Sequence, residues 1–297
     1  MRKILITLIF LSAFSLVKGQ YELQFNQLIK SVEFINPGYN AIQKNITSTI
    51  IYTNQWNGFP GSPTTAVANI HVPLKSKHLG FGALFTNESL GHRDLRTGGV
   101  TVDADIRIGA SSYLTLGIMG GYQLIDYNLE NATTAYLDQI SDIYNYNSTI
   151  VGTGVNLFVQ RLHFGASGFY QIAPNETGSE LTNQLTLYSN VSYWFRLDDA
   201  WRLKLAGLYK TRGNYSSIYE GGAFFLFKDI AWLGLSYRMK SAAITMLDVK
   251  LSDFIRIGYS YAMGVGELAN FTGSSHEIQL HITIPERNRK SNLAEIK

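Results

Sequence analysis

Short stretches in which apolar and polar residues alternate with a period of two recur along most of this 297-residue chain. The clearest stretch runs from Leu181 to Leu197. One of its faces carries Leu181, Leu185, Leu187, Val191, Tyr193, Phe195 and Leu197, and the other carries Thr182, Gln184, Thr186, Asn190, Ser192 and Arg196. Such alternation indicates a β-strand with one apolar and one polar face. We expect about fourteen strands, at residues 46–56, 64–74, 79–88, 98–109, 112–125, 148–160, 161–172, 181–197, 201–212, 216–228, 230–239, 241–251, 253–264 and 275–284.

Two architectures produce this alternation: a soluble sandwich with its apolar face inward, and a membrane barrel with its apolar face toward lipid. The connections between the expected strands tend to alternate in length. The short ones are 75–77, 109–111, 160–161, 197–200, 228–229 and 252, and the long ones are 87–97, 126–147, 173–180 and 265–274. The connections near Tyr215 and Met239 are short as well, so the alternation is imperfect. Short turns on one side and long loops on the other are typical of outer-membrane barrels.

Aromatic residues gather near the ends of the expected strands, as in the girdles of membrane barrels. They are Tyr52, Trp56, Tyr113, Tyr122, Tyr170, Trp194, Trp201, Tyr237 and Phe254. After residue 19 no apolar run reaches the ~18 residues that a transmembrane helix needs. We therefore predict an all-β fold, a transmembrane antiparallel outer-membrane β-barrel of about 14 strands, with short periplasmic turns and longer extracellular loops.

The first residues are typical of a secretory signal, since Arg2 and Lys3 precede an apolar run from Ile4 to Val17. We predict a signal peptide at residues 1–19, a periplasmic or plug-like segment at 20–45, the barrel at 46–284 and a periplasmic tail at 285–297. The chain has no Cys, so it has no disulfides and no lipoprotein anchor. An exported outer-membrane location follows from these features.

Composition and motifs argue against several function classes. The net charge is +3 without a basic block, so nucleic acid is not an expected partner. The motif Gly80-Phe81-Gly82 lacks the helix that a phosphate cradle needs. The few His residues show no metal-ligand spacing. We predict no cofactor, no metal and no enzymatic activity.

One local motif resembles a hydrolase relay. In a strand, Ser275 and Glu277 point to one face and His276 to the other, so these three cannot form a relay among themselves. His163 is the better single candidate, although a hydrogen-bonded lumen residue is the simpler interpretation. A lipid hydrolase or acyltransferase would need a Ser/His pair that spacing does not establish.

Charged residues on lumen-facing positions form a further candidate site. Asp103, Asp105 and Arg107 share one strand face, which suits acid–base chemistry, cation binding or structural pairing. We expect pairing across the barrel, and the predicted lumen charge cluster is Asp103, Asp105, Arg107, Arg196, Arg202, Lys204 and Arg256.

Several stretches, taken in order, resemble one known family. They are "INPGYNA" (35–41), "IYTNQWNGFPGSPTT" (51–65), "VPLKSKHLGFGALFTNESLG" (72–91) and "GSSHEIQLHITI" (273–284). The chain resembles the PorP/SprF family of the Bacteroidota type IX secretion system over nearly its whole mature length. The resemblance implies a barrel that serves protein export and, in gliding bacteria, adhesin display. Its implied partners are secreted proteins with a type B C-terminal domain, and the periplasmic ring and lipoprotein components of the secretion motor.

The leading hypothesis is a non-enzymatic barrel that binds such a C-terminal domain and retains or displays it at the cell surface, or couples it to the motor. The stretch from Asn54 to Thr65 joins the first two strands on the extracellular side and is either a turn with an aromatic anchor or a contact patch. Candidate rim residues are Trp56, Phe59, Pro60, Pro63, His92, Tyr136 and Phe271. The alternative is a passive channel, for which a lumen lined by Arg and Lys would favour anions.

Overall fold

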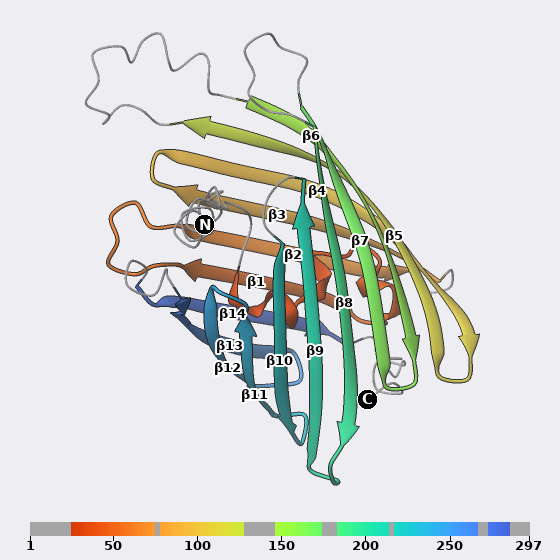
Figure 1. Cartoon of the computed structure of the whole chain (residues 1–297). Coiled ribbons are helices and arrows are strands. Elements are labelled where there is room, and N and C mark those ends of the chain that lie inside the picture. The colour runs from red at the N-terminus through yellow and green to blue at the C-terminus, as the bar shows by residue number, and fades with distance from the viewer. Residues whose placement is uncertain are drawn as a thin grey trace, which may run out of the picture.

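The computed structural model describes residues 25–74, 78–127, 146–173, 183–213, 217–266 and 273–285, and these form one closed barrel (Figure 1). Its strands within this part of the chain are β1 (Ile46–Asn54), β2 (Thr64–Leu74), β3 (Leu79–Leu90), β4 (Arg93–Gly109), β5 (Ser112–Tyr127), β6 (Tyr146–Val159), β7 (Leu162–Ile172), β8 (Gln184–Arg196), β9 (Trp201–Arg212), β10 (Ile218–Phe227), β11 (Ala231–Arg238), β12 (Ala242–Lys250), β13 (Ile255–Gly264) and β14 (Ser275–Ile284). Each pairs antiparallel with its sequence neighbours, and β1 closes the barrel on β14 from Ile46↔Ile284 to Asn54↔His276. The predicted antiparallel barrel of about fourteen strands is confirmed.

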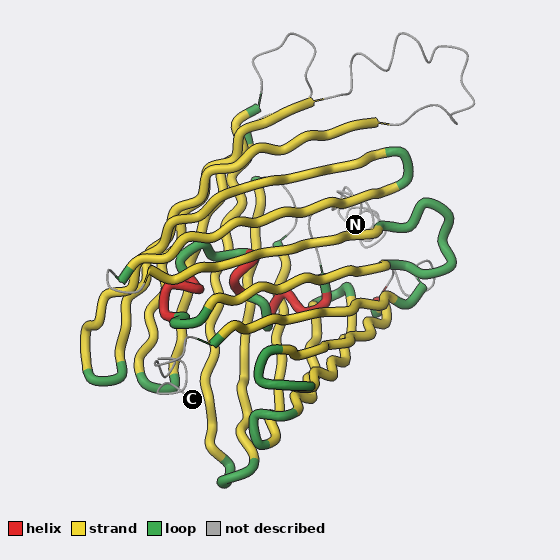
Figure 2. The backbone as a smooth tube through the Cα atoms, turned by 180° about the vertical axis from the view of Figure 1, so that it is seen from behind, coloured by secondary structure: helices red, strands yellow, loops and turns green. Residues whose placement is uncertain are grey.

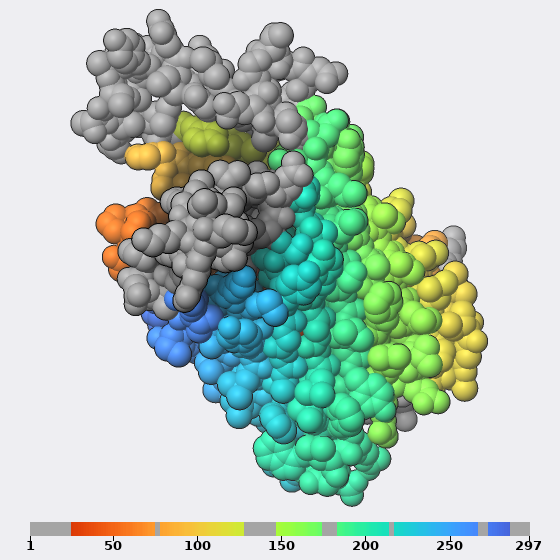
Figure 3. All heavy atoms as spheres, in the orientation of Figure 1, coloured from red at the N-terminus to blue at the C-terminus, as the bar shows by residue number. Residues whose placement is uncertain are grey.

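Burial along the strands decides between the two architectures. In β8, Leu185, Leu187 and Val191 are exposed, whereas Thr186 and Asn190 are buried. On the outer surface Val100 is 65% exposed and Ile118 is 63% exposed, while Thr115 and Asn156 inside are fully buried. The barrel is thus apolar outside and polar inside, which suits lipid around it. The space-filling view shows strands from β7 to β12 as one continuous outer surface (Figure 3).

The barrel wall is uneven in height. β4 has 17 residues and β5 has 16, whereas β11 has 8 and β12 has 9. Figure 1 shows the long strands rising well beyond β10 to β13. The tight turns after β6, β8, β10 and β12 lie at the opposite end, together with the start of β1 and the end of β14, and we assign that end to the periplasm.

The prediction of a long extracellular loop at residues 87–97 is wrong. β3 continues to Leu90 and β4 starts at Arg93, so only Gly91 and His92 separate them, with Gly91 at φ +57°. Most residues of this hairpin are polar on both faces. The alternation is therefore lost there although the ladder of backbone hydrogen bonds continues.

The aromatic residues divide between the two faces. Tyr52, Tyr122, Tyr170, Trp201, Tyr237 and Phe254 are exposed on the outside, as a girdle requires. Tyr113 and Trp194 are buried, so their assignment to the girdle is wrong. They share strand parity with Thr115 and Ser192, and this parity directs them into the lumen.

Three short 3-10 helices lie inside the barrel, shown in red in Figure 2: η1 (Asn26–Ile29), η2 (Val32–Phe34) and η3 (Tyr39–Ile42). We call residues 25–45, which contain them, the luminal segment. Its buried side chains include Phe25, Leu28, Val32 and Ile35, which belong to one apolar cluster with wall residues such as Phe224. Among the described residues, no helix is long and apolar enough to cross a membrane.

Candidate functional site: a segment across the lumen beneath an extracellular rim

The start of the luminal segment is held by a buried carboxylate of β14. Glu277 accepts hydrogen bonds from the backbone amides of Asn26, at 2.6 Å, and Gln27, at 2.9 Å, and from the hydroxyl of Thr53, at 2.7 Å. Arg238 donates a hydrogen bond to the carbonyl of Phe25 at 3.0 Å. Charge-assisted bonds of this kind are about twice as strong as neutral ones, so this end is firmly anchored.

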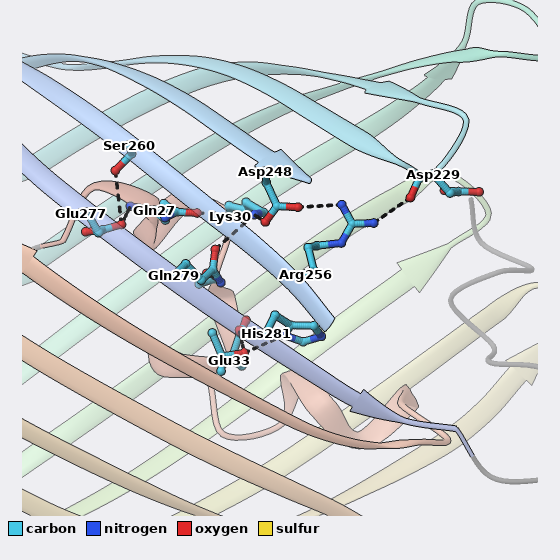
Figure 4. A network of polar contacts seen from close by, with 12 residues as sticks. Gln27, Lys30, Glu33, Asp229, Asp248, Arg256, Ser260, Glu277, Gln279 and His281 are labelled. Atoms are coloured by element: carbon cyan, nitrogen blue, oxygen red, sulfur yellow. Dashed lines mark hydrogen bonds and ion pairs between the residues drawn. The ribbon is translucent and has the colours of Figure 1, made fainter. Parts of the chain in front are cut away.

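A shared ion pair holds the next turn. Lys30 lies 2.7 Å from Asp248 of β12, and Arg256 of β13 lies 2.6 Å from the other oxygen of the same carboxylate (Figure 4). Lys30 also donates to Gln279 at 3.2 Å. At the far end, Lys44 pairs with Asp105 of β4 at 3.0 Å. The segment is therefore tied to opposite sides of the wall.

The closest contact is the seat of Asn36, Pro37 and Gly38 on β5 and β6. The Asn36 amide donates to the carbonyl of Val155, at 3.2 Å, and to Asn156 Oδ1, at 3.0 Å. Gly117 and Gly154 are directly paired across these strands. A Cβ on Gly117 would lie 2.3 Å from Gly38 N, and one on Gly154 would lie 2.2 Å from Asn36 Oδ1. Only glycine at both positions allows the segment to approach the wall this closely.

The segment separates two cavities. The outer cavity, about 150 Å³, lies toward the extracellular ends of β3 to β9 and is floored by Phe34, Met119 and Phe169. The inner cavity, about 200 Å³, lies toward the periplasm and is lined by Lys30, Glu33 and Tyr39 from the segment. Glu33 lines the inner cavity, and Phe34, the next residue, lines the outer cavity. The luminal segment therefore lies across the lumen between the two cavities.

Glu33 makes stability depend on pH. Desolvation by burial raises the pKa of its carboxyl above the ordinary value, against a hydrogen bond from Thr49 at 3.2 Å. A raised pKa in the folded state means that the fold favours the protonated carboxyl. The stability that this group contributes is therefore complete below its unfolded-state pKa, and it is lost as pH rises through its folded-state pKa. We expect Glu33→Gln to be more resistant to urea than the native chain at pH 8, with the gain vanishing at pH 4. A gain of equal size at both values would contradict this.

The extracellular rim includes a compact loop at residues 55–63, the rim loop. The Gln55 amide donates to the Pro63 carbonyl at 2.9 Å and closes it, and Trp56 takes a left-handed φ of +54°. The loop is held on both sides, by Gly91 N–H to Gly61 O at 3.0 Å and by Asn57 N–H to Ser274 O at 2.8 Å.

The predicted rim residues differ in exposure. Phe59 is 56% exposed, and Pro60 and His92 are exposed as well, whereas Trp56 is only partly exposed. Pro63 is buried, so its prediction as a contact residue is wrong: its position under the loop leaves it no free surface. Tyr136 and Phe271 lie outside the described residues.

The seven residues of the predicted lumen charge cluster are not brought together. Asp103 pairs with His71 at 3.1 Å and Asp105 with Lys44 and His78, each at 3.0 Å, so the expected pairing across the barrel is wrong. Neighbouring strands and the luminal segment supply closer partners than the far wall. Arg107, Arg196 and Arg202 lie at exposed or half-exposed periplasmic positions, and Arg202 pairs with Asp229. Lys204 is buried over the Trp194 ring, and Arg256 joins Asp248.

The residues that suggested a hydrolase have structural partners. His163 is buried, with Nε2 3.1 Å from Asn156 Oδ1 and its ring stacked on Phe158. His276 faces outward against Tyr259, while Ser275 and Glu277 face inward, as strand parity predicted. The role of Glu277 in anchoring the segment was missed, because sequence parity shows the face of a residue but not what lies there.

A family model described as "Type IX secretion system membrane protein PorP/SprF" matches residues 17–282. The chain belongs to the PorP/SprF family. This PorP/SprF protein is therefore an outer-membrane barrel of type IX secretion, with partners among secretion components and cargo, and its family is a membrane barrel family rather than a known enzyme family. No curated protein matches the chain.

Among solved structures, the PorP/SprF barrel is similar to the CymD monoaromatic hydrocarbon channel, with a TM-score of 0.51 and 10% identity over 89% of this chain and 94% of that one. At this identity the likeness shows the barrel fold alone. Two weaker likenesses are the Acinetobacter baumannii outer membrane protein Omp33, with a TM-score of 0.46 and 8% identity over 82% and 98% of the chains, and the KdgM porin, with 0.42 and 8% over 80% and 99%.

Proposed function

We propose that this PorP/SprF barrel binds the type B C-terminal domain of a secreted surface protein or adhesin at its extracellular rim, and retains it at the cell surface. The chain would be exported by cleavage after Gly19, which the mass of the mature protein tests. The barrel acts as a scaffold and carries out no chemistry of its own.

The rim loop is the observation that carries the proposal. Phe59 and Pro60 are presented on a loop whose backbone hydrogen bonds tie it to itself, to the β3–β4 hairpin and to Ser274. A large apolar side chain on a rigid support loses little conformational entropy on binding, and such residues dominate protein interfaces. His92 is also exposed, on the β3–β4 hairpin whose Gly91 is hydrogen-bonded to Gly61 of this loop.

The luminal segment favours a scaffold over a passive channel. It is anchored to β4, β5, β6, β12 and β14 and lies between the outer and inner cavities. A barrel that serves as a diffusion pore needs an open lumen. With the lumen occupied, the contacts available to a secreted domain are those of the rim and the outer cavity.

Cargo capture by the Trp56→Ala, Phe59→Ala double variant tests the proposal. We expect the double variant to recover at least about tenfold less secreted protein than the native chain after gentle detergent extraction and mass spectrometry, because truncation of an aromatic anchor costs about 2 kcal/mol or more. The recovered protein should be held through its C-terminal domain.

The matched control is Phe254→Ala. Phe254 is a phenylalanine of nearly equal exposure, 53%, at the periplasmic end of the barrel. Its truncation should leave the recovery of cargo unchanged. Unchanged recovery with the rim double variant would exclude the rim loop as the contact.

A further inference from the structure

The outer cavity presents apolar surface at the extracellular end of a lumen that is otherwise largely polar. Inward apolar residues elsewhere in the wall, such as Phe224 and Ile244, pack with the luminal segment in one apolar cluster. The apolar residues that line the outer cavity include Phe34, Leu84, Leu95, Ile125, Ile150 and Phe169. Of these, Leu84, Ile150 and Phe169 are only partly buried. Their remaining surface would gain free energy from being covered by an apolar group.

The polar side chains of the same cavity already bind one another. Gln171 donates hydrogen bonds to Gln123 Oε1, at 2.8 Å, and to Ser148 Oγ, at 3.0 Å. It accepts one from the guanidinium of Arg212 at 2.9 Å. Gln123 in turn donates to the hydroxyl of Thr97 at 3.1 Å. Since these groups are paired within the wall, what the cavity offers to a ligand is its apolar surface.

Size and access limit what can fill the cavity. Its volume is about 150 Å³. An apolar protein cavity of about this volume holds a molecule of the size of benzene. Phe34 of the luminal segment lies on its periplasmic side, where the preceding residue, Glu33, already lines the inner cavity. An occupant therefore enters from the extracellular side and brings one ring or one large aliphatic group.

The cavity and the rim loop share the β3–β4 hairpin. Glu88 of β3 and Arg93 of β4 lie on either side of its turn and line the cavity. Gly91, between them, donates its amide to the carbonyl of Gly61 in the rim loop at 3.0 Å. A protein held at the rim loop is therefore next to a hairpin that also forms part of the cavity wall.

We propose that the captured secreted domain inserts one aromatic or large aliphatic side chain into the outer cavity. An apolar anchor in a preformed pocket is a frequent source of affinity at protein interfaces. This inference rests on the proposed capture of a secreted domain and adds which group of that domain the barrel recognises. A free apolar molecule from the medium would have the same chemistry, and the experiment distinguishes the two sources.

A single thiol in the cavity tests whether it accepts an apolar group. The chain has no Cys, so Ile150→Cys creates one reactive position in the lining. We expect the folded variant to react with benzyl methanethiosulfonate, and to unfold at a higher urea concentration with the benzyl group attached than with a charged sulfonatoethyl group. The control is Thr149→Cys, one residue earlier and exposed on the outer face, where the two groups should give equal midpoints. Equal midpoints for the two groups at Ile150→Cys would overturn the proposal.

The second measurement compares the empty and the filled cavity. The variant is purified free of cargo, reconstituted in nanodiscs and mixed with the secreted protein that the native chain recovers. The benzyl group at Ile150→Cys should weaken binding about tenfold, because it takes the place of one buried apolar side chain. A reductant that removes the group should restore binding. The benzyl group at Thr149→Cys should leave the affinity unchanged.

Unchanged affinity with the cavity filled, together with the higher urea midpoint, would indicate a site for free apolar molecules and would overturn the assignment to a side chain of the secreted domain. In that case the capture of cargo at the rim would stand and only this inference would fail. If the native chain recovers no secreted protein at all, the proposed capture fails and this inference fails with it.

Discussion

The Gly117→Val, Gly154→Val double variant is expected to conduct ions in planar bilayers, whereas the native chain is expected to stay closed. The Pro37–Gly38 backbone of the luminal segment rests directly on Gly117, and the side chains of Asn36 and Pro37 rest on Gly154. A Cβ at either position falls within 2.3 Å of segment atoms, so the wall and the segment cannot both keep their places. The wall strands β5 and β6 are paired on both sides, and the segment is the part that can move.

Overpacking costs about 1–3 kcal/mol at each site, which raises the population of the displaced state roughly 5- to 150-fold per site. Single-channel recording measures the population of this displaced state as the frequency of open events. Gly98→Val, Gly120→Val is the matched control, because a Cβ at either of these glycines meets nothing within 4 Å. A control variant that conducts as often as the lumen-facing one would show that the segment does not close the barrel.

Replacement of Glu277 by Ala is expected to destabilise the folded barrel by about 2–6 kcal/mol. Its carboxylate accepts the amides of Asn26 and Gln27 in a fully buried position, and alanine would leave both donors without this partner. Each buried donor left unsatisfied costs about 1–3 kcal/mol. The midpoint of urea unfolding in detergent, followed by the gel mobility of the folded barrel, measures the loss.

Asp253→Ala provides the comparison for that measurement. Asp253 pairs with Lys250 in the periplasmic turn after β12, where its side chain is 82% exposed. Lys250 lowers the pKa of this carboxyl through a hydrogen bond. A solvent-exposed pair of this kind contributes little to the stability of the fold, so we expect only a small shift of the unfolding midpoint. If the two variants unfolded at the same urea concentration, Glu277 would not be the anchor of the luminal segment.

The alternation of side chains along the strands was the sequence feature that predicted most about which residues face the lipid and which face the lumen. It placed Leu187 and Val191 outside and Asn190 inside, and it separated His276 from Ser275 and Glu277, because side chains alternate strictly along a strand. It failed at residues 87–97, where β3 and β4 continue although their residues are mostly polar on both faces. The same parity would have moved Tyr113 and Trp194 from the girdle into the lumen, but closeness to a strand end was given more weight.

Partners across space could not be predicted in the same way. Asp105 binds Lys44 of the luminal segment and His78 near the start of β3, rather than the arginines expected from the far wall. Glu277 binds amides about 250 positions earlier in the chain. Such contacts depend on which residues closure of the barrel brings to the same depth, and no local pattern contains that information.

The sequence by itself determined that this chain forms an outer-membrane barrel of about fourteen strands, because a period-two pattern with an apolar face, repeated at strand length, has few stable solutions in lipid. Its local motifs, by their resemblance, indicated the PorP/SprF family. Only the tertiary structure decided where the luminal segment lies and what holds it. Gly117 and Gly154 appear in the sequence as two ordinary strand glycines. They become a seat for Pro37 and Gly38 only when β5 and β6 pair and the segment folds back onto them, because a close backbone approach is a property of two surfaces together.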